Sequence, residues 1–328
     1  MNALPCADGI SRLTIRHKPC GTIAPTMGSI AHYIKEIGRG ARGAKPLARE
    51  QAADLFGQIL DGAVTDLEIG AFCLAMRVKG ETTSEMAGFL DATHARLAKL
   101  PASDRPVVVL PSYNGARKLP VLTPLLALLL AREGLPVLVH GSATESSRVL
   151  ASEVLALLDR PAWSSLRRIG DGEVAMVGTE LLHPGLQRLL DVRRVVGLRN
   201  AGHSVVKLMQ PVDGPAVVIG SYTHPAFAAV MTELFELLGM TALLSRGLEG
   251  EVVSDPRRTP QLDGFLRGRP VPLQAQQPGT QAEVPGLPAS IAAADTAEYT
   301  RSVLAGRLPV PPAIAAQVDH ILQLTSHA

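Results

Sequence analysis

Hydrophobic positions between residues 29 and 100 recur at the spacing of helix faces. The first helix is predicted from four apolar residues that share one face: Ile30, Tyr33, Ile34 and Ile37. The second is predicted from five: Leu47, Ala52, Leu55, Phe56 and Ile59. Thr65 and Thr82 are each followed three residues later by a glutamate, the capping-box pattern that begins a helix. The pattern therefore predicts a small N-terminal α-helical domain over residues 29–102.

From Pro106 onward, short valine-rich runs alternate with amphipathic segments. The runs PVVVLP, PVLVHG, PAVVIGS and TALLSRG are typical of buried strands. Helices are predicted at Leu122–Arg132, Ser147–Leu158, Leu181–Leu190 and Pro225–Leu238. This alternation predicts an α/β domain over 103–328, with a central mixed sheet flanked by helices. Helices around 150–200 are expected to pack back on the helical domain, residues 268–294 to form a Pro-rich loop, and two helices to close the chain.

Residues 1–28 show no periodicity. They are interpreted either as a disordered extension or as a mis-called gene start, with Met27 as the true beginning. No apolar run reaches the roughly 18 residues that cross a bilayer. The three cysteines have no metal-ligand spacing. We expect a cytoplasmic protein that has no membrane partner.

Charge is informative by its distribution, because the formal net charge of the chain is only +2. Between Arg188 and Lys207 five basic residues stand against one acid, Asp191. Such a segment favours a polyanionic partner. Aromatic residues make up only 3% of the chain, which argues against an extended platform for stacked bases.

The segment PSYNGARK, residues 111–118, lies between a predicted strand and a predicted helix. In α/β proteins this position meets phosphates at a helix N-terminus. Here the loop carries a single glycine, the bulky Tyr113, and the basic pair Arg117 and Lys118. Tyr113 is expected either to stack on a base or to fill the pocket.

Common catalytic patterns are absent from the sequence. It contains no Gly-rich dinucleotide fingerprint, no Walker loop, no His-Glu-x-x-His and no Cys-x-x-Cys pair. His140, His183 and His203 lack ligand spacing, and His140 is expected in the core. We therefore assign no catalytic residue and no metal ligand.

Two longer stretches resemble the anthranilate phosphoribosyltransferase family, which shares its fold with the nucleoside phosphorylases of glycosyltransferase family 3. They are LEIGAFCLAMRVKGETTSEMAGF and LLHPGLQRLLDVRRVVGLR. The resemblance runs from residue 29 over nearly the whole chain. It implies the fold described above and a dimer formed through the helical domain, for which we consider Ile30, Tyr33, Ile34 and Leu55.

The catalytic loops of that family are altered. Its phosphoribosyl-pyrophosphate loop, Gly-Thr-Gly-Gly-Asp, aligns with residues 111–115. Its Asn-x-Ser-Thr loop keeps one hydroxyl here, and its Lys-His-Gly-Asn-Arg loop loses both cations. The resemblance thus implies a vestigial phosphoribosyl pocket composed of Ser112, Tyr113, Asn114, Gly115, Thr123, His140 and Gly141.

The family's metal-binding Asp-Glu pair aligns with Val252 and Val253. Glu249 and Glu251 lie nearby, but on a strand they would point to opposite faces. We therefore expect no cofactor, with Mg²⁺ required only if the chain is a transferase. Arg193 matches the arginine of the family that faces anthranilate.

The combination of SYNGARK, HG and GLEGEV is similar to the YbiB-type branch, which keeps this fold without its catalytic loops. That resemblance implies a homodimer that binds nucleic acid through basic surface grooves. Our hypothesis is DNA or other nucleic-acid binding without sequence preference. The residues considered for phosphate contact are Arg117, Lys118, Arg193, Arg194, Arg199, Lys207, Arg246, Arg39 and Arg42.

Two alternatives stay open. One is a phosphoribosyltransferase with an altered substrate, in which Arg193 holds the acceptor and Ser112, Asn114 and Thr123 hold phosphate. The other is an interaction protein with an acidic protein partner.

Overall fold

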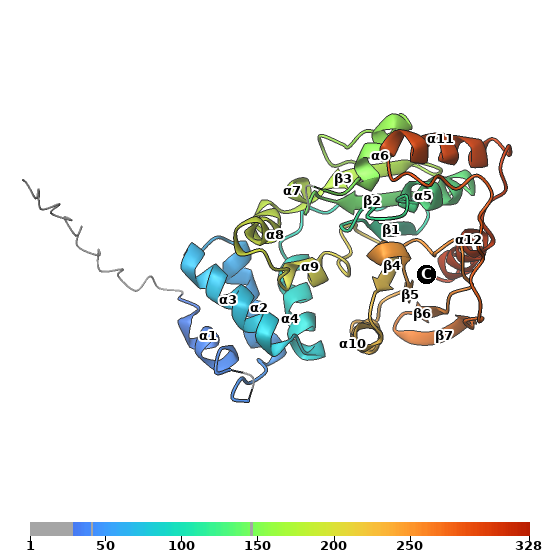
Figure 1. Cartoon of the computed structure of the whole chain (residues 1–328). Coiled ribbons are helices and arrows are strands. Elements are labelled where there is room, and N and C mark those ends of the chain that lie inside the picture. Colours follow the sequence, from blue (N-terminus) through green and yellow to red (C-terminus); the bar gives the residue numbers. More distant parts are fainter. Residues whose placement is uncertain (1–28, 41, 145–146) are drawn as a thin grey trace, which may run out of the picture.

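The computed structural model describes residues 29–40, 42–144 and 147–328, so the predictions for residues 1–28 lie outside it. Four helices come first: α1 (Ala31–Ile37), α2 (Arg49–Leu60), α3 (Asp66–Lys79) and α4 (Thr83–His94). Figure 1 shows them as one unit beside the sheet. The predicted capping boxes begin α3 and α4, where the hydroxyls of Thr65 and Thr82 accept from the third helical N–H.

A mixed sheet of seven strands follows, in the order β3-β2-β1-β4-β5-β6-β7. Its strands are β1 (Val107–Pro111), β2 (Val137–Gly141), β3 (Val174–Gly178), β4 (Ala216–Tyr222), β5 (Ala242–Arg246), β6 (Leu262–Leu266) and β7 (Arg269–Gln274). The first five are parallel, and β6 and β7 are antiparallel. The predicted α/β fold class is therefore confirmed.

The sheet divides the core into two. Along β1, Val107 and Val109 belong to one core, while Val108 and Leu110 belong to the other, as side chains of a strand alternate between faces. One face packs against α5 (Thr123–Arg132), α6 (Ala151–Leu157), α11 (Ala293–Leu304) and α12 (Pro312–Thr325). The other packs against α7 (Thr179–Leu182), α8 (Pro184–Val196), α9 (Gly202–Val205) and α10 (Pro225–Leu237), and its core continues into the four N-terminal helices.

The junction between helices and sheet depends on α8, which lies against α2. Gly185 permits this contact, because an added Cβ would lie 2.0 Å from the Leu60 carbonyl oxygen. In contrast, α6 packs against α5 and α11 on the sheet. No helix within the described residues is both long and apolar enough to cross a membrane.

Strand β7 occupies the first residues of the segment predicted as a loop, 268–294, so that boundary is corrected. The prediction was misled by Pro270 and Pro272, which cannot donate to a ladder. Because β7 is the last strand of the sheet, its outward N–H groups need no partner.

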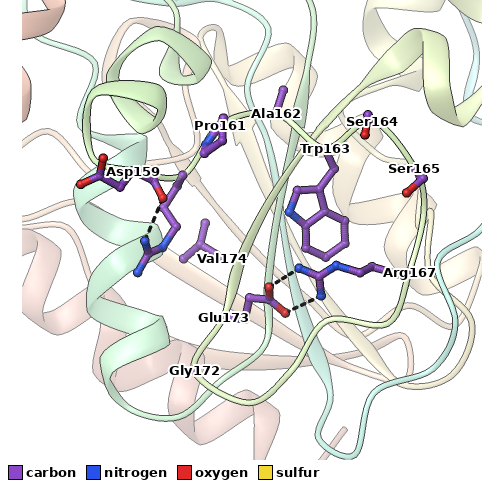
Figure 2. Close-up of a pocket in the computed structure, with 11 residues that line it drawn as sticks. Asp159, Pro161, Ala162, Trp163, Ser164, Ser165, Arg167, Gly172, Glu173 and Val174 are labelled. Atoms are coloured by element: carbon purple, nitrogen blue, oxygen red, sulfur yellow. Dashed lines mark hydrogen bonds and ion pairs between the residues drawn. The ribbon is translucent and has the colours of Figure 1, made fainter.

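The segment between α6 and β3 runs along the opposite edge of the sheet. The N–H of Trp163 donates to the Met176 carbonyl oxygen at 2.8 Å, so part of the outer edge of β3 is paired. The same segment encloses an open cavity of about 560 Å³ (Figure 2).

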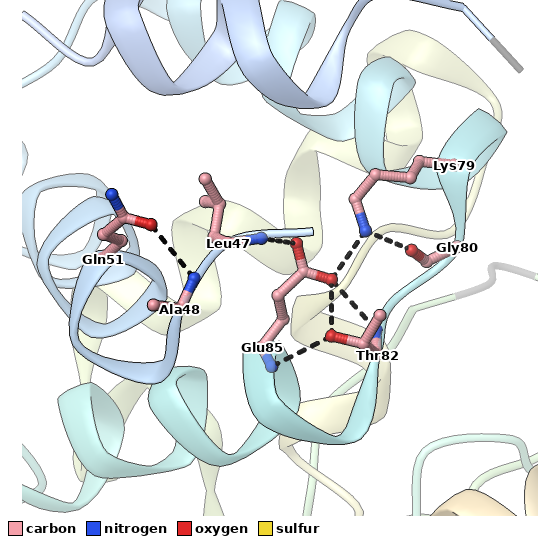
Figure 3. Close-up of polar contacts among 7 residues, drawn as sticks. All are labelled: Leu47, Ala48, Gln51, Lys79, Gly80, Thr82 and Glu85. Carbon is pink, nitrogen blue, oxygen red and sulfur yellow. Dashed lines mark hydrogen bonds and ion pairs between the residues drawn. The ribbon is translucent and has the colours of Figure 1, made fainter. Parts of the chain in front are cut away.

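A buried ion pair joins α3 to α4. The Lys79 ammonium lies 2.6 Å from the Glu85 carboxylate, and their side chains are 8% and 0% exposed. Glu85 also accepts from the N–H groups of Leu47 and Thr82, at 2.9 and 3.0 Å. As Figure 3 shows, one carboxylate thus connects three segments of the helical unit.

We expect Glu85→Ala to lower the free energy of unfolding by about 3–5 kcal/mol, because the Lys79 ammonium then stays buried without a counter-charge. Urea denaturation followed by circular dichroism measures this loss. The control is Glu36→Ala, which removes the exposed pair with Arg39 (2.6 Å) and should cost less than about 1 kcal/mol. Equal losses in both variants would contradict the assigned role of Glu85.

Candidate functional site

The loop after β1, residues 112–122, lies at the carboxyl ends of the parallel strands, where α/β proteins bind ligands. Ser112, Tyr113, Asn114 and Gly115 are all buried. Gly115 has φ +65°, a conformation that favours glycine. The loop thus keeps the place and the amides of an anion-binding loop, in a tightly packed form.

An internal carboxylate occupies this loop. Glu251, which is 2% exposed, accepts from the N–H groups of Asn114 and Gly115 at 2.8 and 2.9 Å. It also accepts from the Ser112 hydroxyl at 2.5 Å and the Thr123 hydroxyl at 2.8 Å. Three of these four groups belong to Ser112, Asn114 and Thr123, the residues that the transferase alternative assigned to phosphate. In this structure their hydrogen-bonding capacity is used by the protein's own anion.

A second carboxylate binds the next turn of the same loop. Glu249 accepts from the N–H groups of Arg117 (2.7 Å), Lys118 (3.0 Å) and Leu119 (3.4 Å). The side chains of Arg117 and Lys118 remain exposed. Their backbone is fixed while their charges face solvent.

The expectation that Glu249 and Glu251 point to opposite faces of a strand was wrong. Residues Leu248–Gly250 form a 3-10 turn, in which Glu249 has φ +52° and Gly250 φ +86°. An added Cβ at Gly250 would lie 1.8 Å from the Asn114 side-chain nitrogen. Glycine therefore permits the close approach that directs both carboxylates into one loop.

Arg117 and Lys118 do not lie at the N-terminus of the helix that follows their loop. Helix α5 begins at Thr123, so both residues lie in the turn that precedes it. Any contact of these two residues with phosphate uses their side chains, because Glu249 already occupies their N–H groups.

Tyr113 fills the interior of the vestigial pocket. It is 3% exposed, and its hydroxyl lies 2.8 Å from His140 Nδ1 and 3.0 Å from the Thr179 hydroxyl. Burial lowers the pKa of His140 to about 3, so the imidazole is neutral. Gly141 permits the loop to pack closely against the end of β2, because an added Cβ at this position would lie 2.0 Å from the Ser112 carbonyl oxygen. Tyr113 is thus a packing residue and does not present its ring to a base.

Cations gather around His203 at the α8–α9 junction. Burial lowers the pKa of His203 to about 3, and the charges of Arg199, Arg193 and Lys207 contribute to this shift. Lys207 itself is directed inward, since its ammonium donates to the Gly250 carbonyl oxygen at 3.1 Å. Burial lowers the pKa of Lys207 to about 8, against the opposing effect of Glu251. Lys207, which follows α9, thus connects this part of the chain to the turn at Leu248–Gly250.

The remaining basic residues of the hypothesis lie in three places. Arg194 pairs with Asp191 at 3.1 Å and donates to the Ala143 carbonyl oxygen at 3.0 Å. Arg246 is exposed at the carboxyl end of β5. Arg39 and Arg42 lie in the α1–α2 connection, which Figure 1 places at the end of the helical unit away from the sheet. The structure does not bring these two together with the others.

Sequence reasoning missed the role of Glu251. The available signal was GLEGEV, in which glycines flank two acids and permit a turn. Glu251 of this motif bonds to the loop after β1. In the family resemblance, that loop lacks the glycines that bind pyrophosphate.

Comparisons with known proteins show the family of this chain. The model of the helical bundle domain of the glycosyl transferase family matches residues 31–96. An anthranilate phosphoribosyltransferase of Methylorubrum extorquens is 30% identical over 253 residues, 74% of this chain and 73% of the enzyme. The uncharacterized protein YbiB of Escherichia coli (strain K12) is 35% identical over 302 residues, 90% of this chain and 94% of YbiB. The chain belongs to the YbiB branch of the anthranilate phosphoribosyltransferase family.

Solved enzymes of this family share the fold. The anthranilate phosphoribosyltransferase (TrpD) of Thermus thermophilus superposes with a TM-score of 0.70 at 22% identity, covering 90% of this chain and 88% of the enzyme. The enzyme of Saccharomyces cerevisiae in complex with PRPP and Mg gives 0.66 at 14% identity, with the same coverage.

The residues of this branch member do not fit phosphoribosyl pyrophosphate with Mg²⁺. Val252 and Val253, at the positions of the family's acidic pair, are apolar and at most 1% exposed. Mg²⁺ prefers oxygen ligands. The carboxylate oxygens of Glu249 and Glu251 are instead occupied by hydrogen bonds from backbone N–H groups. Within residues 29–40, 42–144 and 147–328, no group of three or more His, Cys, Asp or Glu side chains is arranged to hold a metal ion.

We expect Glu251→Ala to lower the free energy of unfolding by about 2–5 kcal/mol, because two buried N–H groups lose their acceptor. Inorganic phosphate should raise the Tm of this variant more than that of the wild type, since its oxygens can reach the vacated amides. Differential scanning fluorimetry measures both, with sodium chloride at equal ionic strength as the control. Equal shifts in the two proteins would show that Glu251 does not occupy an anion site.

Proposed function

We propose that this protein is a cytoplasmic homodimer that binds nucleic acid through the phosphate backbone, without reading base sequence. The sequence hypothesis of a DNA-binding member of this fold is thus retained as our proposal. The proposal rests on the basic side chains that stay exposed while Glu249 and Glu251 are bonded to the loop after β1.

One observation carries the proposal: Glu249 holds the backbone of Arg117 and Lys118, while their side chains stay exposed. Within the part of the chain that the structure describes, no carboxylate forms an ion pair with Arg117, Lys118 or Arg246. These cations follow the carboxyl ends of β1 and β5. Cations held at fixed positions on a surface suit phosphates that are regularly spaced along a strand.

Arg193 near the end of α8 and Arg199 in the α8–α9 connection support a larger positive surface. The charges of Arg199 and Arg193 each lower the pKa of His203, so both lie near its ring. Phosphate contact by several cations at once gives affinity without sequence information. The transferase activity of the relatives is not favoured, because the loop amides and hydroxyls already hold Glu251.

An apolar surface supports self-association. Leu67, Leu74 and Val78 on α3 are 77%, 47% and 66% exposed, and their spacing places them on one helix face. Val195 at the end of the neighbouring α8 is 90% exposed. We propose that a second copy of the chain covers this surface, since homodimers commonly join identical patches.

Two of the four residues first considered for the dimer face need correction. Ile30 and Leu55 are fully buried in the helical unit, so neither can contact a partner. Tyr33 and Ile34 are partly buried and pack against the same core. Helical periodicity reveals the buried face of a helix, and it does not reveal which other face stays apolar.

Binding to nucleic acid should weaken strongly with salt. We expect Arg117→Ala combined with Lys118→Ala to reduce the slope of log K against log salt by about 1.5, because two phosphate contacts are lost. Fluorescence anisotropy with labelled single-stranded and duplex DNA and with RNA measures the slope. The matched control is Arg132→Ala at the C-terminal end of α5, which should leave the slope unchanged. No binding by the wild type at low salt would refute the proposed function.

The dimer should depend on the α3 surface. We expect Leu74→Glu combined with Val78→Glu to yield monomers, because two charges would be buried at the interface. Sedimentation velocity measures the mass, and circular dichroism verifies the fold. The control is Leu157→Glu, an exposed apolar position on α6 that is 45% exposed and lies away from this surface. A wild-type monomer, or a dimer unaffected by the α3 changes, would contradict the assignment.

A further inference from the structure

An open cavity lies beside β3, lined by the segment between α6 and β3. Its lining comprises Asp159, Arg160, Pro161, Ala162, Trp163, Ser164, Ser165, Arg167, Gly172, Glu173 and Val174. It holds about 560 Å³, which lies within the range of small-molecule sites. Trp163 is the only tryptophan of the chain.

The indole of Trp163 is held in place. The backbone N–H of this residue pairs with β3, and the Arg167 guanidinium lies 3.8 Å from the centre of the ring. Arg167 is in turn fixed by Glu173 through two hydrogen bonds of 2.5 and 3.0 Å. Glu173 also accepts from the Gly170 N–H at 2.9 Å. Figure 2 shows this stack on one side of the hollow.

The lining carries two acids, Asp159 and Glu173, and two bases, Arg160 and Arg167, and of the two bases Arg160 has no ion-pair partner in the part of the chain that the structure describes. Arg167 and Glu173 neutralise each other, and the Arg167 guanidinium lowers the pKa of that carboxyl. Arg160 donates to the Asp159 carbonyl oxygen at 2.9 Å, and no carboxylate of the described residues forms an ion pair with it. Figure 2 places Asp159 and Trp163 on opposite sides, with Val174 between them. The hydroxyls of Ser164 and Ser165 lie on the rim beside the indole.

We propose that this cavity binds one nucleotide of a single-stranded nucleic acid, with the base against Trp163 and the phosphate near Arg160. The proposal rests on the proposed function and deepens it. Stacking on an aromatic ring is sequence-tolerant, since every base has a π-face. A base in a duplex is already stacked and paired, so its entry would cost the free energy of unstacking and unpairing it. One ring provides one stacking subsite, which is consistent with the scarcity of aromatic residues elsewhere.

The test uses the full-length protein and two independent readouts. Trp163 emission reports on this cavity alone, and anisotropy of a labelled oligothymidylate reports on total binding. We expect the single strand to quench the emission and a duplex of equal length to leave it unchanged. Trp163→Ala should weaken single-strand binding about 5- to 100-fold without weakening duplex binding. Trp163→Phe, which keeps a ring, should retain most of the affinity.

Arg160→Ala should also weaken single-strand binding. Its matched control is Arg168→Ala, because Arg168 is exposed, pairs with Asp104 and does not line the cavity. Single-strand binding with unchanged emission, and with equal affinity in Trp163→Ala, would overturn the nucleotide site and leave the proposed function intact. Quenching by adenosine monophosphate, with no binding of any nucleic acid, would refute the proposed function and replace the single-strand site by a site for free mononucleotides.

Discussion

The bonds between Glu251 and the loop after β1 determine how the rest of this surface is built. A buried carboxylate is costly unless its oxygens are fully hydrogen-bonded. Here two amides and two hydroxyls satisfy it. The same bonds satisfy loop amides that would otherwise be buried without an acceptor. An anion-binding loop has thereby become an internal joint that connects β1 to the segment after β5.

Several other features depend on this joint. The turn at residues 248–250 brings Glu249 against the N–H groups of residues 117–119. It also presents the Gly250 carbonyl oxygen to the Lys207 ammonium. Tyr113 and His140 then occupy the space beneath. The side chains of Arg117 and Lys118 are left exposed by the same turn, so their charge is available to an external ligand. The filled loop and the outward-facing cations are two aspects of one arrangement.

Much of the fold could be predicted from the sequence, because period and capping are local. Short segments of the sequence are enough to predict the helical unit, the parallel strands and the capping boxes of Thr65 and Thr82. The contact between Glu251 and Ser112 joins residues 139 positions apart, and it depends on a left-handed turn that a strand pattern conceals. Sequence reasoning found the altered loop and could not find what fills it. It also could not separate Ile30, buried in the core, from Leu67, exposed on the surface.

The two edges of the sheet have a consequence for solubility during folding. β7 carries Pro270 and Pro272, and β3 is paired along part of its outer edge by the segment that contains Trp163. An edge strand with free amides is a template for pairing with strands of other molecules, and proline or a covering segment prevents this. Molecules of this chain are therefore protected against association through their sheets. The dimer that we propose accordingly uses helices, where side chains set the partner and the orientation.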